Sequence, residues 1–179
     1  MLRVSMKARK GDLWVSAVLY LILGVIAIAF ILGAAIPLVN KLKDRKTVAQ
    51  AKEVLFTLDE ILRRVANEGP GSQRELSLFT INAGKLIIDQ DAEVIRWELE
   101  TEAVIQEPNI DIKEGVLTLR LDETKTEGKY LMSISTKYDG IDLNLKSPFN
   151  NPFIGEFSVL VQHAGRFPAN KPEIVVNIK

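Results

Sequence analysis

The sequence predicts an α+β protein: a long N-terminal helix, transmembrane in part, followed by an all-β antiparallel sandwich or open-barrel domain of about eight strands. Three observations lead to this prediction. A run of 27 uncharged, mostly apolar residues, Leu13–Val39, stands near the N-terminus. Apolar residues then recur with helical spacing as far as residue 66. From residue 72 to the C-terminus they alternate with polar residues, which is the period of a β-strand.

The composition narrows the possible functions before any motif is considered. Lysine and arginine number 23, aspartate and glutamate number 23, and the formal net charge is zero, so the charge balance gives no indication of nucleic-acid binding. Cysteine is absent, which excludes disulfides, zinc–thiolate centres and cysteine nucleophiles. The β domain must therefore be held together by its hydrophobic core.

The apolar segment 13–39 is longer than the ~20 residues that a helix needs to cross a bilayer. The alternatives are a buried helix of a soluble protein, which usually shows a polar stripe, and a secretory signal peptide, whose apolar core is only about 7–15 residues long. The charges that set orientation nearly balance across the segment, so charge alone does not decide which end is cytoplasmic. The flanking basic residues are Arg3, Lys7, Arg9 and Lys10 before it, and Lys41, Lys43, Arg45 and Lys46 after it.

An amphipathic half, residues 40–66, continues the helix beyond the apolar half. A stripe of apolar residues runs along one face at heptad-like spacing, and it predicts either packing on the chain's own β domain or a seam between subunits, or both along different parts. Pro37 should kink or loosen the helix, and the sequence Asn67–Gly71 should end it. The stripe consists of Val48, Ala51, Leu55, Leu58, Leu62 and Val65.

The β domain, residues 72–179, contains eight alternating segments and no helical one, so we expect antiparallel pairing and no nucleotide-binding crevice. Asn82-Ala83-Gly84 and Asp139-Gly140 each have the composition of a hairpin turn, and His163-Ala164-Gly165 indicates another turn. The expected strands are Leu76–Ile81, Lys85–Asp89, Ile95–Ile105, Leu117–Leu121, Tyr130–Tyr138, Ile141–Leu145, Phe157–Val161 and Ile174–Ile178.

No pattern in the chain predicts catalysis. His163, the sole histidine, should be a surface residue, because no serine elbow or acid accompanies it. Asp89-Gln90-Asp91 resembles a calcium loop but lacks its glycine and glutamate, so we expect a hairpin turn. Glu98, Glu100 and Glu102 should form a solvated face or pair with lysines of a neighbouring strand. We therefore expect no catalytic residue, no metal and no cofactor, with a membrane-tethered enzyme as the least favoured class.

The segment Lys7-Ala8-Arg9-Lys10-Gly11-Asp12-Leu13-Trp14 places a short basic leader, a glycine and a polar residue before a long apolar helix. This arrangement resembles the class III signal peptide of archaeal type IV pilins and archaellins. The resemblance implies that a prepilin-type signal peptidase removes residues 1–11 by cutting between Gly11 and Asp12, with Lys10 also in the processing site. The mature chain would then begin with the helix 12–68.

The resemblance extends over the whole architecture and implies a subunit of an archaeal surface filament or of its assembly complex. The partners would be other pilin-like subunits, the membrane and the peptidase. The N-terminus would be cytoplasmic and the β domain extracellular, in a single-pass membrane protein that can enter a pilus or adhesion filament. Ser16 stands where bacterial pilins carry glutamate, which favours the archaeal branch. Ala29, Gly33, Ala34 and Ala35 would permit close approach of neighbouring helices.

A second function class accounts for the same features. The leader stays uncut, and the chain is a signal-anchored extracellular binding module of a membrane complex. The mature N-terminus distinguishes the two: Asp12 for the pilin-like subunit, and Met1 or Leu2 for the uncut anchor.

Overall fold

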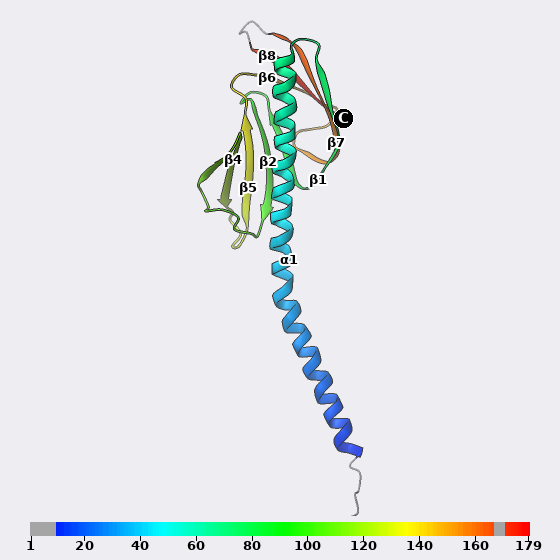
Figure 1. The fold of residues 1–179 in the computed structure, drawn as a ribbon. Coiled ribbons are helices and arrows are strands. Elements are labelled where there is room, and N and C mark those ends of the chain that lie inside the picture. Colours follow the sequence, from blue (N-terminus) through cyan, green and yellow to red (C-terminus); the bar gives the residue numbers. More distant parts are fainter. Residues whose placement is uncertain (1–9, 167–170) are drawn as a thin grey trace, which may run out of the picture. The chain divides into compact units, whose positions relative to one another are not determined.

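A computed structural model of the chain describes residues 10–166 and 171–179 (Figure 1). Arg3, Lys7 and Arg9 of the expected leader lie outside the described residues. The chain divides into two compact units, with the boundary between Asn40 and Lys41. The second unit therefore contains the amphipathic part of the helix together with the β domain.

The helix α1 extends over Lys10–Glu68, and Pro37 lies inside it without ending it. Its C-terminus lies where the sequence predicts it. Gly69 follows with a φ of 94°, the left-handed conformation in which glycine commonly ends a helix. The hydroxyl of Ser72 then donates hydrogen bonds to the carbonyls of Val65 and Gly69, at 3.0 Å and 2.8 Å, so a helix-end carbonyl is satisfied.

The described part of the β domain forms one eight-stranded sheet, which confirms the predicted class of a long helix followed by an antiparallel β domain. The order across the sheet is β3-β4-β5-β2-β1-β7-β8-β6, and the sheet is open because β3 and β6 lie at its edges. One pair, β6 with β8, is parallel, which the sequence did not predict. The strands are β1 (Gln73–Asp89), β2 (Val94–Thr101), β3 (Asp111–Glu114), β4 (Leu117–Glu123), β5 (Tyr130–Lys137), β6 (Asp142–Lys146), β7 (Phe153–Arg166) and β8 (Pro172–Ile178).

Within the second unit the sheet curves around the C-terminal half of α1 (Figure 1). All six residues of the apolar stripe are buried, and they belong to a single hydrophobic cluster with the inward-facing residues of the sheet. The helix therefore supplies the second layer of the core, where a sandwich would use a second sheet.

The expected hairpin at Asn82-Ala83-Gly84 is wrong, because this segment lies inside the single long strand β1. The first half of β1 pairs with β7 and its last five residues pair with β2. The register against β7 shifts between Ile81 and Leu86, so the Asn-Ala-Gly segment is a bulge, and beyond it Leu86 pairs with Phe153 of β7 and with Trp97 of β2.

The hairpin expected at Asp139-Gly140 is also wrong. A turn is present, with the amide of Ile141 donating to the carbonyl of Tyr138 at 3.2 Å. However, β5 already pairs with β2 on one edge and with β4 on the other, so it has no free edge for β6. The chain leaves β5 at this turn and β6 pairs with β8.

The turn predicted near His163-Ala164-Gly165 is likewise absent, since β7 continues to Arg166. The register against β8 shifts between His163 and Gly165, and Gly165 has a φ of 146°. The glycine therefore marks a bulge within a strand.

Candidate functional site

The first candidate surface is the apolar half of α1. Between Trp14 and Val39 every side chain is exposed except that of Ala35, which is half-buried. In the described part of the chain, α1 is the one helix long and apolar enough to cross a membrane. A helix that is apolar on all sides needs a surrounding other than water, either lipid or other helices.

The small residues expected to allow helix packing lie on this exposed part. A Cβ at Gly33 would meet no atom within 4 Å, and the side chains of Ala29 and Ala34 are exposed. They make no contact with another helix in this single chain. Lys10, Gly11 and Asp12, the expected processing residues, lie in the first turn of α1 and so precede the apolar surface directly.

The amphipathic half of α1 is fixed to the β domain at its N-terminal end by Asp44. One carboxylate oxygen of Asp44 accepts hydrogen bonds from the Thr101 hydroxyl and from the Glu102 amide, both at 2.9 Å. Thr101 is buried at the end of β2, and its hydroxyl oxygen also accepts a bond from the amide of Ala103. Asp44 therefore joins the helix to the end of β2, which stops four residues before the predicted Ile105.

A buried carboxylate lies near the other end of the same helix. Asp59, which the helical pattern places on the polar side, is only 5% exposed. It accepts hydrogen bonds from Nε of Arg63 at 2.9 Å and 3.0 Å, and the Arg63 guanidinium lies 5.7 Å from the ring centroid of Tyr138. Burial raises the pKa of the Tyr138 hydroxyl above its ordinary value of 10.0, and the neighbouring Asp59 carboxylate raises this pKa further.

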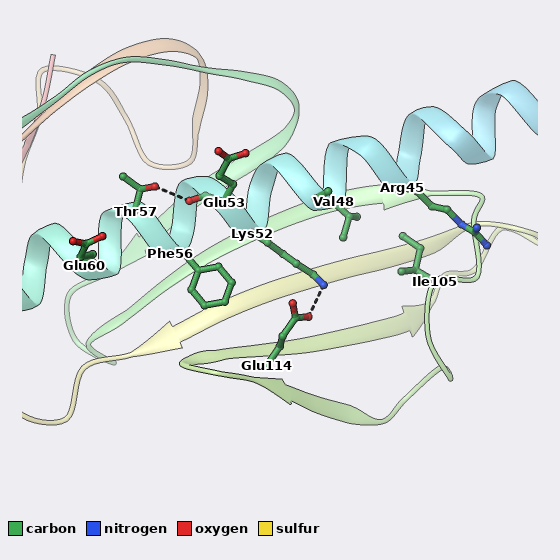
Figure 2. Close-up of a pocket in the computed structure, with 10 residues that line it drawn as sticks. Arg45, Val48, Lys52, Glu53, Phe56, Thr57, Glu60, Ile105 and Glu114 are labelled. Atoms are coloured by element: carbon green, nitrogen blue, oxygen red, sulfur yellow. Dashed lines mark hydrogen bonds and ion pairs between the residues drawn. The ribbon is translucent and has the colours of Figure 1, made fainter.

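A shallow groove of about 570 Å³ runs between α1 and the β3–β4 hairpin (Figure 2). Lys52 from the helix forms an ion pair with Glu114 of β3 across it, and Phe56 lies beside this pair with 38% of its surface exposed. Arg45 and Ile105 are at the opposite end of the groove in Figure 2. The groove combines apolar and oppositely charged side chains, with no histidine or cysteine among its lining residues.

The other candidate residues from the sequence have structural surroundings. Glu98 forms ion pairs with Lys85 of the adjacent strand at 3.1 Å and with Arg96 at 3.2 Å, as predicted for one of the two alternatives. Glu100 and Glu102 are exposed. Asp89-Gln90-Asp91 leads into the β1–β2 turn, where an Asp89 carboxylate oxygen accepts the amide of Ala92 at 3.0 Å. Across residues 10–166 and 171–179 no cluster of three metal-ligating side chains occurs.

The prediction of a surface position for His163 is wrong, since the residue is only 2% exposed. Its Nδ1 accepts a hydrogen bond from the amide of Gly165 at 3.1 Å, and its backbone pairs with Gly71 and Ser72. The bulge at Gly165 allows this bond, and the histidine is a structural element of the sheet.

Comparisons with protein-family models, with curated proteins and with solved structures find no match to this chain. The candidate site with the clearest physical basis is therefore α1 itself, which has an exposed apolar half and an amphipathic half buried in the β domain.

Proposed function

We propose that this chain is a type IV pilin-like subunit of an archaeal surface filament or of its assembly complex. The observation that carries the proposal is that the two halves of α1 have different surroundings. Its C-terminal half completes the core of the β domain, while its N-terminal half is left fully apolar and uncovered. Such a half-helix is stable in lipid and in the centre of a helix bundle, so moving from one to the other exposes no apolar surface to water.

The sequence before the helix supports the same proposal. The leader 1–11 carries four basic residues and no acidic one, and it ends at Gly11 directly before the apolar half. Removal of this leader frees the N-terminus of the helix from charge that an apolar bundle cannot accommodate. The β domain serves as the exposed part of the subunit.

The experiment that tests this proposal is determination of the mature N-terminus after expression with an archaeal prepilin-type peptidase. We expect the intact mass to correspond to a chain that starts at Asp12. A chain that starts at Met1 or Leu2 in every preparation would contradict the proposal and favour the second candidate, an uncut signal-anchored extracellular binding module. That candidate rests on the groove beside Phe56, which offers a partly apolar surface for a partner.

A further inference from the structure

We propose that Lys41, Lys43, Arg45 and Lys46 form a basic collar around α1 that binds anionic lipid headgroups at the membrane surface. The inference rests on the membrane location contained in the proposed function and adds the chemistry of the lipid. All four side chains are exposed and belong to the second compact unit.

The collar surrounds more than half of the helix. With about 100° of rotation and 1.5 Å of rise per residue, the four positions spread over roughly 200° of the circumference and about 8 Å of the helix axis. The remaining arc is occupied by Asp44, which is bound to the end of β2. The basic collar therefore lies on the part of the circumference that Asp44 does not occupy, and Arg45 also lines the groove beside the β domain.

The charge of the collar is not neutralised within the described chain. Farther along α1 the basic residues Lys52, Arg63 and Arg64 each pair with an acidic side chain. None of the four collar side chains makes an ion pair or a hydrogen bond to any residue in the described ranges. Asp44, the one acidic residue within the same stretch, directs its carboxylate to Thr101 and to the amide of Glu102. Both of these donors are neutral, so Asp44 keeps its negative charge, and residues 41–46 carry four cations and one anion, a net charge of +3.

The position of the collar, directly after the apolar run, favours lipid over a protein as its anionic partner. The collar begins two residues after Val39, the last residue of the apolar run. A bilayer has a hydrocarbon core of about 30 Å within a total of about 40–45 Å, so each headgroup layer is roughly 5–8 Å thick, which matches the length of the collar. A protein partner usually contacts one side of a helix. Cations spread over more than half of the circumference suit a negatively charged surface that surrounds the helix.

The proposal is tested with the full-length chain reconstituted in phosphatidylcholine vesicles that contain phosphatidylglycerol. Electron spin resonance of spin-labelled lipids then gives the preference of the protein for phosphatidylglycerol over phosphatidylcholine. In the collar variant Lys41→Gln, Lys43→Gln, Arg45→Gln and Lys46→Gln, we expect this preference to fall at least about threefold at low salt, and the wild-type preference to decrease as salt is added. The leader is present in both proteins, so the difference between them reports the collar alone.

A matched control removes four exposed lysines that are unpaired among the described residues and lie on the β domain. This control variant carries Lys113→Gln, Lys125→Gln, Lys129→Gln and Lys146→Gln, and it should keep the wild-type lipid preference. A second variant preserves the charge of the collar and should also keep the wild-type lipid preference. It carries Lys41→Arg, Lys43→Arg and Lys46→Arg. Circular dichroism of each variant checks that the β domain is folded.

An unchanged lipid preference in the collar variant, or an equal loss in the control variant, would overturn the proposal. A collar variant that keeps its lipid preference but no longer assembles with other subunits would assign the four cations to a protein partner and would also overturn it. Because the measurements of lipid preference do not require cutting at Gly11, failure here is distinguishable from failure of the pilin-like proposal.

Discussion

Gly84 is the residue on which the bulge of β1 depends. Its φ of 82° is unfavourable for any side chain, and a Cβ would lie 2.4 Å from the carbonyl oxygen of Glu98 and 2.8 Å from Nε1 of Trp97. We expect Gly84→Ala to lower the free energy of unfolding by about 2–4 kcal/mol, since backbone strain and overpacking act together. Chemical denaturation of residues 41–179, the second compact unit, measures this change.

Gly128 provides the matched control for this prediction. Its φ is 77°, nearly that of Gly84, but a Cβ there would meet no atom within 4 Å. Gly128→Ala should therefore cost only the backbone strain, about 1 kcal/mol. If both variants lose the same stability, the close approach of β2 to Gly84 does not contribute.

The raised pKa of the Tyr138 hydroxyl predicts that the protein loses stability at alkaline pH. Because burial and the Asp59 carboxylate raise the pKa of its hydroxyl in the folded state, the neutral phenol is favoured by folding. This contribution is complete below the unfolded pKa of 10.0 and is lost as pH rises from there toward the folded pKa. Tyr138→Phe should therefore reduce the slope of unfolding free energy against pH above pH 10, by up to ~1.4 kcal/mol per pH unit.

The comparison for Tyr138 is Tyr130→Phe, a change at the half-buried tyrosine that starts β5, the strand that ends directly before Tyr138. Denaturation curves between about pH 8 and pH 11 would be recorded for the wild type and both variants. Equal slopes above pH 10 in the wild type and in Tyr138→Phe would show that this hydroxyl is not the group responsible.

At the scale of single residues, the sequence predicted the wrong exposure for residues that are buried by contacts with distant segments of the chain. Asp59 lies on the polar side of the helical pattern, but it is buried and interacts with Tyr138, which is 79 positions later in the chain. His163 stands in a segment with the composition of a turn, and it is buried because β7 continues through a bulge. Local composition holds no information about either long-range contact.

At the scale of elements the apolar stripe yields the most direct test of the fold. Leu55 and Leu58 are each 1% exposed. Leu55→Asp or Leu58→Asp would place an unpaired carboxylate in the core, and we expect each to lower the unfolding free energy of residues 41–179 by several kcal/mol. Thermal or chemical denaturation followed by circular dichroism measures the loss.

Ala49→Asp on the same helix serves as the control, because Ala49 is exposed. It should cost less than about 1 kcal/mol, mainly through helix propensity. Should both leucine variants melt with the parent protein, the stripe would face a partner subunit in solution.

The elements themselves were more predictable than their partners. The helix, its end near Gly69 and the alternating segments follow from periodicity and turn composition, which are local. The pairing of β6 with β8 does not follow from local patterns, because it depends on which strand edges remain free once β2, β4 and β5 have paired. The bulge in β1 has the composition of a hairpin turn, and only the pairing with both β2 and β7 distinguishes the two.

At the scale of the whole molecule the proposed function predicts the side of the membrane on which the β domain lies. We expect the N-terminus to be cytoplasmic and the β domain to be outside the cell. Protease added to intact cells should then degrade the β domain while a cytoplasmic marker protein remains intact. Full protection of the domain, with degradation after lysis, would place it inside.

If the proposed function holds, Gly11 links processing of the leader to assembly. Lys10, Gly11 and Asp12 form the first turn of α1, and a peptidase needs an extended backbone, so this turn must open before cutting. Glycine costs a helix about 1 kcal/mol relative to alanine and leaves the backbone unhindered, whereas the branched side chain of valine restricts it. We expect Gly11→Val to leave the protein in the membrane with a folded β domain, but uncut and unassembled. Intact mass and filament yield, measured in a host with the peptidase, report both effects.

The loss of assembly follows from charge. Uncut chains keep Arg9 and Lys10 close before the apolar run in the sequence, and placing each charge in an apolar bundle costs about 2.5–3.5 kcal/mol by membrane-centre insertion values. Gly24→Val is the matched control, since a Cβ at Gly24 meets no atom within 4 Å and the site is remote from the cut. This control should be processed like the wild type. If wild type and Gly11→Val each have the mass of the uncut, full-length chain and both form complexes normally, the leader is never removed. The chain would then act as an uncut anchor, because a bundle core that excludes charge has no place for the leader.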